Sequence, residues 1–105
     1  MNSHSKILNQ IKESVKHQQP DATIILYGSY ARGDNHAHSD IDILILLNKD
    51  KITSADERNI KYPLYDIEFD TGQIISPLVF SVNDWEKRHK ITPLYQNILR
   101  EGIRL

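Results

Sequence analysis

One segment of the sequence places two acids at the head of an apolar run, Asp40-Ile-Asp-Ile-Leu-Ile-Leu-Leu47. Apolar and β-branched residues of this kind predict a β-strand over residues 40–47. Because successive side chains of a strand point to opposite faces, the residues divide into two sets. One face carries Ile41, Ile43, Ile45 and Leu47, and the other carries Asp40, Asp42, Leu44 and Leu46. The segment therefore predicts a sheet with helices packed against it.

The first half of the chain adds a helix and a second strand to this one. Apolar residues at helical spacing predict a helix from about Ser5 to Gln18, and a β-branched run predicts a buried strand at residues 22–27. A further strand is expected from Ile74 to Val82, where Pro77 indicates an edge position or a bulge.

The second half of the chain predicts further helices. Residues 53–72 are expected to form helical pieces separated by a break or kink at Pro63, with Gly72 as the final cap. Two short helices are expected at 84–88 and 93–100, and a last short strand at 103–105. Helices that alternate with about three strands predict an α/β or α+β fold, in one domain over residues 1–105.

Composition limits the classes of function. The 105 residues include 13 basic and 14 acidic side chains, a formal net charge of −1, and no cysteine. Extended nucleic-acid binding needs a basic excess, so it is not expected, although a small phosphate pocket remains compatible with this charge. Thiol chemistry and disulfides are excluded, which fits a cytoplasmic protein. No run approaches the ~20 apolar residues that span a bilayer, so no membrane association is expected.

The two acids at the start of the strand indicate a metal site. Asp40 and Asp42 share a face about 6–7 Å apart at the backbone, and like charges so close repel each other. Mg²⁺ takes oxygen ligands, is typically held by one or two carboxylates plus substrate phosphates, and can act in pairs about 3.5–4 Å apart. The alternative is that Asp40 simply ends the preceding loop at a frayed strand start. The nearby His36 and His38 could bind a transition metal, but a solvated loop is the preferred interpretation.

A glycine-serine turn precedes the acids. In Gly28-Ser-Tyr-Ala-Arg-Gly33, Gly28 has no Cβ, so a phosphate group could approach the backbone closely, and Ser29 adds a hydroxyl and an amide. Arg32 could contact phosphate or fix the turn by pairing with an acid. The turn, a short polar loop and Ser-Asp-Ile-Asp on a strand form a far more specific pattern together than either part alone.

Residues 24–47 resemble the signature of the DNA polymerase beta-like nucleotidyltransferases, and the small size resembles the minimal nucleotidyltransferases of this superfamily. The resemblance implies a mixed sheet with flanking helices. It also implies transfer of a nucleoside monophosphate from a nucleoside triphosphate to an acceptor, with AMP from ATP as the expected pair. Asp40 and Asp42 would be the catalytic ligands of two Mg²⁺ ions, and Gly28, Ser29 and Arg32 would hold the triphosphate.

The sequence departs from the family pattern at one point. The resemblance implies a third carboxylate on the strand at 74–82, but the polar residues there are Ser76 and Ser81. Acids just upstream lie in a stretch expected to be helical and are interpreted as a solvated face: Asp66, Glu68 and Asp70. Without the third acid, metal binding remains expected but the general base is missing.

Three functions follow from these observations. The preferred one is an active nucleotidyltransferase whose acceptor comes from outside, because about 105 residues leave no room for an acceptor domain. Minimal nucleotidyltransferases are commonly encoded beside small helical partners of the HEPN type, and in some such pairs they act as antitoxins that attach AMP to the partner. The second is a catalytically impaired binding module that docks a helical partner protein. The third, a drug-modifying resistance enzyme, is ranked last because such enzymes usually carry an additional helical domain.

Overall fold

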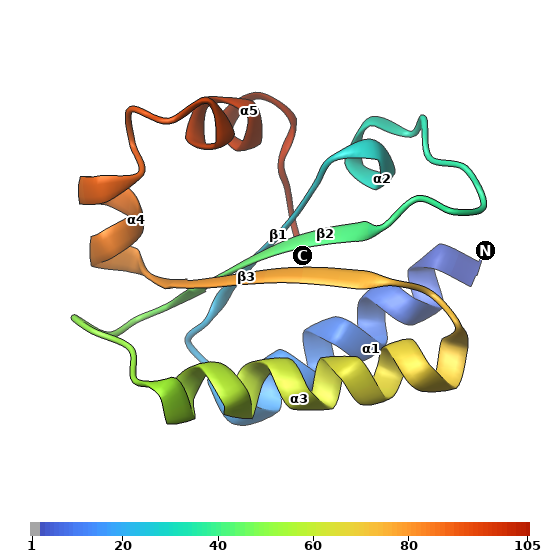
Figure 1. Ribbon diagram of the computed structural model, residues 1–105, viewed down its shortest axis with the longest axis horizontal. Coiled ribbons are helices and arrows are strands. Elements are labelled where there is room, and N and C mark those ends of the chain that lie inside the picture. Colours follow the sequence, from blue (N-terminus) through green and yellow to red (C-terminus); the bar gives the residue numbers. More distant parts are fainter. Residues whose placement is uncertain (1–2) are drawn as a thin grey trace.

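The computed structural model describes residues 3–105, without the side chains of Ser3, His4 and Arg88, and contains a mixed four-stranded sheet (Figure 1). The strands are β1 (Thr23–Tyr27), β2 (Ile41–Leu47), β3 (Ile75–Ser81) and β4 (Ile103–Arg104), in the order β3-β2-β1-β4. β2 runs parallel to β3, and β1 runs antiparallel to both β2 and β4. The expected mixed sheet with flanking helices is confirmed.

Helices cover both faces of this sheet (Figure 1). They are α1 (Ser3–Gln18), α2 (Ser29–Arg32), α3 (Ser54–Thr71), α4 (Val82–Arg88) and α5 (Pro93–Glu101). Helices α1 and α3 pack on one face, where they bury the predicted stripe of Ile41, Ile43, Ile45 and Leu47. On the other face, Trp85 of α4 and Ile98 of α5 cover Leu44 and Leu46. The predicted alternation along β2 is confirmed, so Asp42 shares its face of the sheet with α4 and α5.

Pro63 does not separate two helical pieces, and this expectation was wrong. α3 is one helix from Ser54 to Thr71 with Pro63 inside it. Ile60, one turn before Pro63 on the inner side of the helix, and Leu64, the next residue, are fully buried, so packing offsets the hydrogen bond that proline cannot make. The helix begins at a capping box between Thr53 and Asp56.

Glycine and proline mark several of the predicted boundaries correctly. Gly72 ends α3 in the left-handed region with φ 75°, and its N–H donates to the carbonyl oxygen of Glu68. Pro77 lies on β3, which is an edge strand as expected. The turn after Gly28 differs from the prediction, because Ser29–Arg32 forms one short helical turn before the polar loop.

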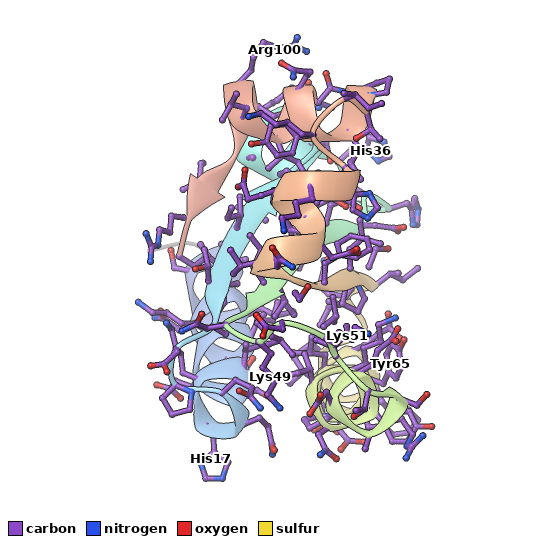
Figure 2. The ribbon with its side chains drawn as sticks, turned by 90° about the vertical axis from the view of Figure 1, so that its left-hand side faces the viewer. His17, His36, Lys49, Lys51, Tyr65 and Arg100 are labelled. Carbon is purple, nitrogen blue, oxygen red and sulfur yellow. The ribbon has the colours of Figure 1, made fainter. Side chains whose placement is uncertain are left out.

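The outer side of α3 carries exposed aromatic residues. Phe69 is 88% exposed, Tyr62 is 60% exposed, and Tyr65, which is labelled in Figure 2, is 42% exposed. Asp66 and Asp70 are exposed on the same helix, as expected for a solvated face. Within residues 3–105, no helix combines the length and apolar character that crossing a membrane requires.

Candidate functional site

Gly28 and Asp42 are in direct contact where β1 ends. Asp42 pairs with Tyr27 across the antiparallel β1–β2 ladder, which brings the Asp42 side chain over the next residue, Gly28. A Cβ at Gly28 would collide with Oδ2 of Asp42 and lie 3.2 Å from its Cγ. Gly28 also has φ 76° and ψ −156°, a conformation that residues with a Cβ rarely adopt. Glycine is therefore required here both for the backbone and for the space that the carboxylate fills.

The two acids stand at the start of β2 in different surroundings. Asp40 is exposed and precedes the strand by one residue, whereas Asp42 is on the strand and half-buried. The parallel register places Ser76 of β3 beside Asp42, and the Ser76 hydroxyl donates to Oδ2 of Asp40 at 3.2 Å. The β3 position next to the acid pair therefore carries a hydroxyl in place of a carboxylate.

The acid upstream of β3 does not reach this site. Glu68 lies on α3, which packs on the opposite face of the sheet from Asp42. Its Oε1 instead accepts a hydrogen bond of 2.8 Å from the Ile75 N–H, which fixes the start of β3. No carboxylate of α3 thus replaces the missing third acid.

Charge and burial together perturb the titration of the site. Burial raises the pKa of Asp42, the neighbouring Asp40 and Glu101 carboxylates raise it further, and the Arg32 guanidinium opposes them. Burial and then the Asp42 charge raise the pKa of Tyr27 to about 12, so its hydroxyl is neutral at physiological pH. The acid pair thus carries a negative charge that its protein surroundings do not fully compensate.

Arg32 pairs with two acids, Asp34 in the following loop and Glu101 at the end of α5. Its Nε donates to Oδ2 of Asp34 at 3.1 Å, and its Nη1 donates to Oε2 of Glu101 at 3.0 Å. Glu101 also accepts a 3.3 Å hydrogen bond from the Gly28 N–H through Oε1. Arg32 was expected either to contact phosphate or to fix the turn by pairing with an acid. Its pairs with Asp34 and Glu101 show the second role.

Glu101 is the residue of this region that sequence reasoning missed. It lies 73 residues after Gly28, and no periodicity or motif connects the two. The only local signal is its position directly before Gly102, at the end of a predicted helix, which says nothing about its partner. The contact arises because α5 leads directly into β4, which pairs with β1.

The carboxylates of Asp40 and Asp42 suit a magnesium ion whose remaining ligands come from a substrate and from water. Within the described part of the chain, no three histidine, cysteine or acidic side chains cluster closely enough to hold a metal. Two neighbouring carboxylates, of which Asp42 has a pKa raised by burial and by the Asp40 charge, nevertheless fit Mg²⁺ that takes its remaining ligands from water and phosphate. His36 and His38 lie exposed in the loop, where the His38 N–H donates to Nδ1 of His36 at 3.4 Å.

A hollow of about 520 Å³ lies at the other end of β2, beyond the strand's last residue. Its lining includes Lys51 of the β2–α3 loop (Figure 2), Phe80 and Lys87. The chemistry nevertheless favours the Asp40–Asp42 end, because surface lysines alone do not define an anion site and because burial raises the pKa of Asp42 at that end.

Two curated proteins resemble parts of the chain. "Putative protein adenylyltransferase MJ0141" of Methanocaldococcus jannaschii is 38% identical over 58 residues, which cover 54% of this chain and 57% of that protein. A bifunctional uridylyltransferase/uridylyl-removing enzyme of Pseudomonas aeruginosa is 36% identical over 62 residues, 52% of this chain and 6% of that enzyme. The match to the first spans just over half its length, and the match to the second a small fraction.

Solved structures share the fold over nearly the whole chain. A chain of a toxin–antitoxin crystal structure with AMP-PNP superposes with a TM-score of 0.62 and 19% identity, covering 98% of this chain and 72% of that chain. A chain from the tri-AMPylated Shewanella oneidensis HEPN toxin in complex with MNT antitoxin gives a TM-score of 0.60 at 19% identity, covering 95% and 69%. At this identity the likeness shows the fold.

A family model gives the assignment. The model described as "Nucleotidyltransferase domain" matches residues 8–101, which include β1, the Gly28-Ser29 turn, both acids and Glu101. The match covers most of the chain and agrees with the mixed sheet and the acid pair described above. The chain therefore belongs to the nucleotidyltransferase domain family.

Proposed function

We propose that the chain transfers AMP from ATP to a hydroxyl group of a helical HEPN-type partner protein. The contact between Gly28 and Asp42 is the observation that carries this proposal, because it joins the glycine-serine turn to the acid pair in one site. The adenylyltransferase name of one relative and the AMPylated HEPN toxin of one structural neighbour support AMP and a HEPN partner.

The proposed reaction is a displacement at the α-phosphorus of the triphosphate. The acceptor oxygen forms a bond to that phosphorus, the bond from phosphorus to the oxygen bridging the β-phosphate breaks, and pyrophosphate leaves with that electron pair. The acceptor proton passes to solvent, because Ser76 stands where the family pattern implies an acid. Positioning and charge neutralisation then account for most of the acceleration.

Each residue of the site has a role in this reaction. Asp40 and Asp42 would hold Mg²⁺. When bound, this ion would neutralise phosphate charge and make the attacking oxygen a better nucleophile. Gly28 makes room for the Asp42 carboxylate at the end of β1, and the hydroxyl and amide of the next residue, Ser29, are donors for phosphate oxygens. Arg32, nearly half exposed, adds positive charge beside the same turn.

The test uses the intact chain, Mg²⁺, ATP labelled at the α-phosphate, and a HEPN-type protein of the same genome as the acceptor. The proposal requires label on the partner, and it requires that label to disappear with Asp40→Asn and Asp42→Asn. Glu57→Gln is the matched control, since it removes a carboxylate from the ion pair with Lys61 on α3, away from the site. Absence of label with wild-type protein and bound ATP would refute the transfer.

Ser76 favours a second candidate, a module that binds the partner without chemistry. General acid–base groups contribute about 10²–10⁴-fold to a rate, so a site without one can retain nucleotide binding and lose useful turnover. This second function would be established if wild-type protein and Asp42→Asn inhibit the activity of the partner equally and neither leaves label on it.

A further inference from the structure

The side chain of Glu101 joins two points of the glycine-serine turn. Its Oε1 accepts from the Gly28 N–H at 3.3 Å, and its Oε2 accepts from Nη1 of Arg32 at 3.0 Å. Gly28 and Arg32 are the residue before α2 and the last residue of α2. One carboxylate therefore holds both ends of the turn that the proposed function assigns to the triphosphate.

Glu101 is itself held rigidly. It is the last residue of α5, whose Ile98 is buried against Leu44 and Leu46. The next residue, Gly102, donates to the Ile98 carbonyl oxygen at 2.7 Å, and a Cβ there would lie 2.7 Å from Cγ2 of Ile25. The close approach lets the chain pass directly from α5 into β4, so Glu101 stands on an element fixed against the sheet.

Strand β4 fixes this end of the chain relative to β1. Ile103 and Arg104 pair with Leu26 and Ile25, and the Leu105 N–H donates to the Ile24 carbonyl oxygen at 2.8 Å. Glu101 is thus tied to the same strand that carries Gly28 at its end. Figure 1 shows α5 and α2 on the same side of the sheet, with the α5–β4 connection descending beside β1.

We propose that Glu101 is a positioning residue that holds the Gly28–Arg32 turn in the shape that receives the triphosphate. This inference rests on the proposed function for its consequence, although not for the contact itself. An exposed ion pair alone is worth little, but Glu101 also binds the backbone of Gly28, and only 22% of its side chain is exposed. Because Gly28 contacts Asp42, a displaced turn would also disturb the acid pair.

Two substitutions separate the two contacts of Glu101. In Glu101→Gln, the amide oxygen can still accept from the Gly28 N–H, but the ion pair with Arg32 is lost. In Glu101→Ala both contacts are lost. We expect the Kd for AMP-PNP with Mg²⁺ to rise roughly twofold to fivefold in Glu101→Gln. In Glu101→Ala we expect a rise of about tenfold or more, by analogy with the residues that orient metal ligands, whose loss weakens metal binding by about this factor.

A second measurement, made without nucleotide, tests whether Glu101 holds the Gly28–Arg32 turn in place. Amide hydrogen exchange at residues 28–34 should be faster in Glu101→Ala, while exchange in β2 and α3 stays as in the wild type. Glu57→Gln is the control, because it breaks an ion pair of similar type on α3 and should alter neither exchange at 28–34 nor the Kd. If Glu101→Ala does not fold, Glu101→Gln supplies both measurements.

The outcomes are distinguishable. Unchanged exchange at residues 28–34 and an unchanged Kd in the variants would overturn the inference, as would tighter AMP-PNP binding, which would mean that the Glu101 carboxylate competes with phosphate. If the wild-type protein fails to bind AMP-PNP but exchange is faster in Glu101→Ala, the proposed function is refuted. The structural role of Glu101, which is to hold the Gly28–Arg32 turn, is then still established.

Discussion

The carboxylate of Asp42 occupies the space in which a side chain at residue 28 would begin. The contact lies where the end of β1 meets the start of β2, and it leaves no room for any residue larger than glycine. It also makes the position of Asp42 depend on the shape of the turn. A substitution at Gly28 is therefore expected to act on the acid pair.

Gly28→Ala should impair both stability and the site. The new methyl group collides with the Asp42 carboxylate, and φ 76° is strained for alanine. Strain of this kind costs about 1–3 kcal/mol, before the cost of moving Asp42 is added. Chemical denaturation should show a lower free energy of unfolding, and AMP-PNP binding with Mg²⁺ should be lost or strongly weakened.

Gly33→Ala is the matched control for this prediction. Gly33 has a similar φ of 80°, but nothing lies within 4 Å of a Cβ placed there. Gly33→Ala should lose only the free energy of unfolding that a positive φ costs alanine, about 1 kcal/mol, and it should bind nucleotide as the wild type does. Equal losses of stability and binding in the two variants would contradict the role of the Gly28–Asp42 contact.

Asp42→Asn should stabilise the protein at neutral pH while it abolishes transfer. Burial and the Asp40 charge raise the pKa of Asp42, so the folded state binds its proton more tightly than the unfolded state does. The free energy of unfolding of the wild type therefore falls as the pH rises from the pKa of Asp42 in the unfolded chain through its raised pKa in the folded protein. Below that window both states are protonated and the penalty vanishes.

The measurement is the difference in Tm between Asp42→Asn and wild type across pH, without metal. The difference should favour Asp42→Asn at pH 7 and shrink on acidification, and Mg²⁺ should raise the Tm of wild type more than that of the variant. A pH-independent difference in Tm, or a variant less stable at neutral pH, would show that the carboxylate is better compensated than its neighbours indicate.

Pro63→Ala should stabilise α3. Proline at this position leaves one carbonyl of the preceding turn without its helical partner, and alanine supplies the missing N–H. The gain in the free energy of unfolding should be about 1 kcal/mol or more, reduced by the extra freedom that alanine gives the unfolded chain. Urea denaturation measures it, and a loss of stability would mean that the helix is built around the proline.

The strands and most helix ends could be predicted from sequence because each depends on local pattern. The alternation from Ile41 to Leu47 predicts the faces of β2, and Gly72 predicts the end of α3 through the left-handed backbone it permits. The error at Pro63 has a physical cause. Local propensity disfavours proline inside a helix, but burial of Ile60 and Leu64 outweighs it, and burial is set by tertiary packing.

The site was predictable only where its residues are close in sequence. The turn at Gly28 and the acids at Asp40 and Asp42 lie within one hairpin-like unit, so pattern and resemblance identify them together. Glu101 could not be found in this way, because its contacts with Gly28 and Arg32 exist only once β4 has paired with β1. Long-range pairing of this kind leaves no periodic signal in a single sequence.

Ser76→Asp should raise the rate of transfer. Ser76 lies beside Asp42 in the parallel register and already donates to Asp40, so an aspartate there would place a third carboxylate next to the acid pair. A correctly placed general base contributes about 10²–10⁴-fold, and a graft should recover at least about tenfold in kcat with little change in KM for ATP. The added charge should also lower the Tm without metal, since three carboxylates repel more than two.

Ser76→Asn separates the charge of this graft from its shape. Asparagine matches aspartate in size but accepts no proton at neutral pH, so its kcat should stay at or below that of the wild type. The gain with aspartate should depend on pH, and it should disappear as the new carboxylate becomes protonated. If Ser76→Asp and Ser76→Asn transfer AMP equally well, the acceptor needs no base from β3, and the serine is not what limits this chain as an enzyme.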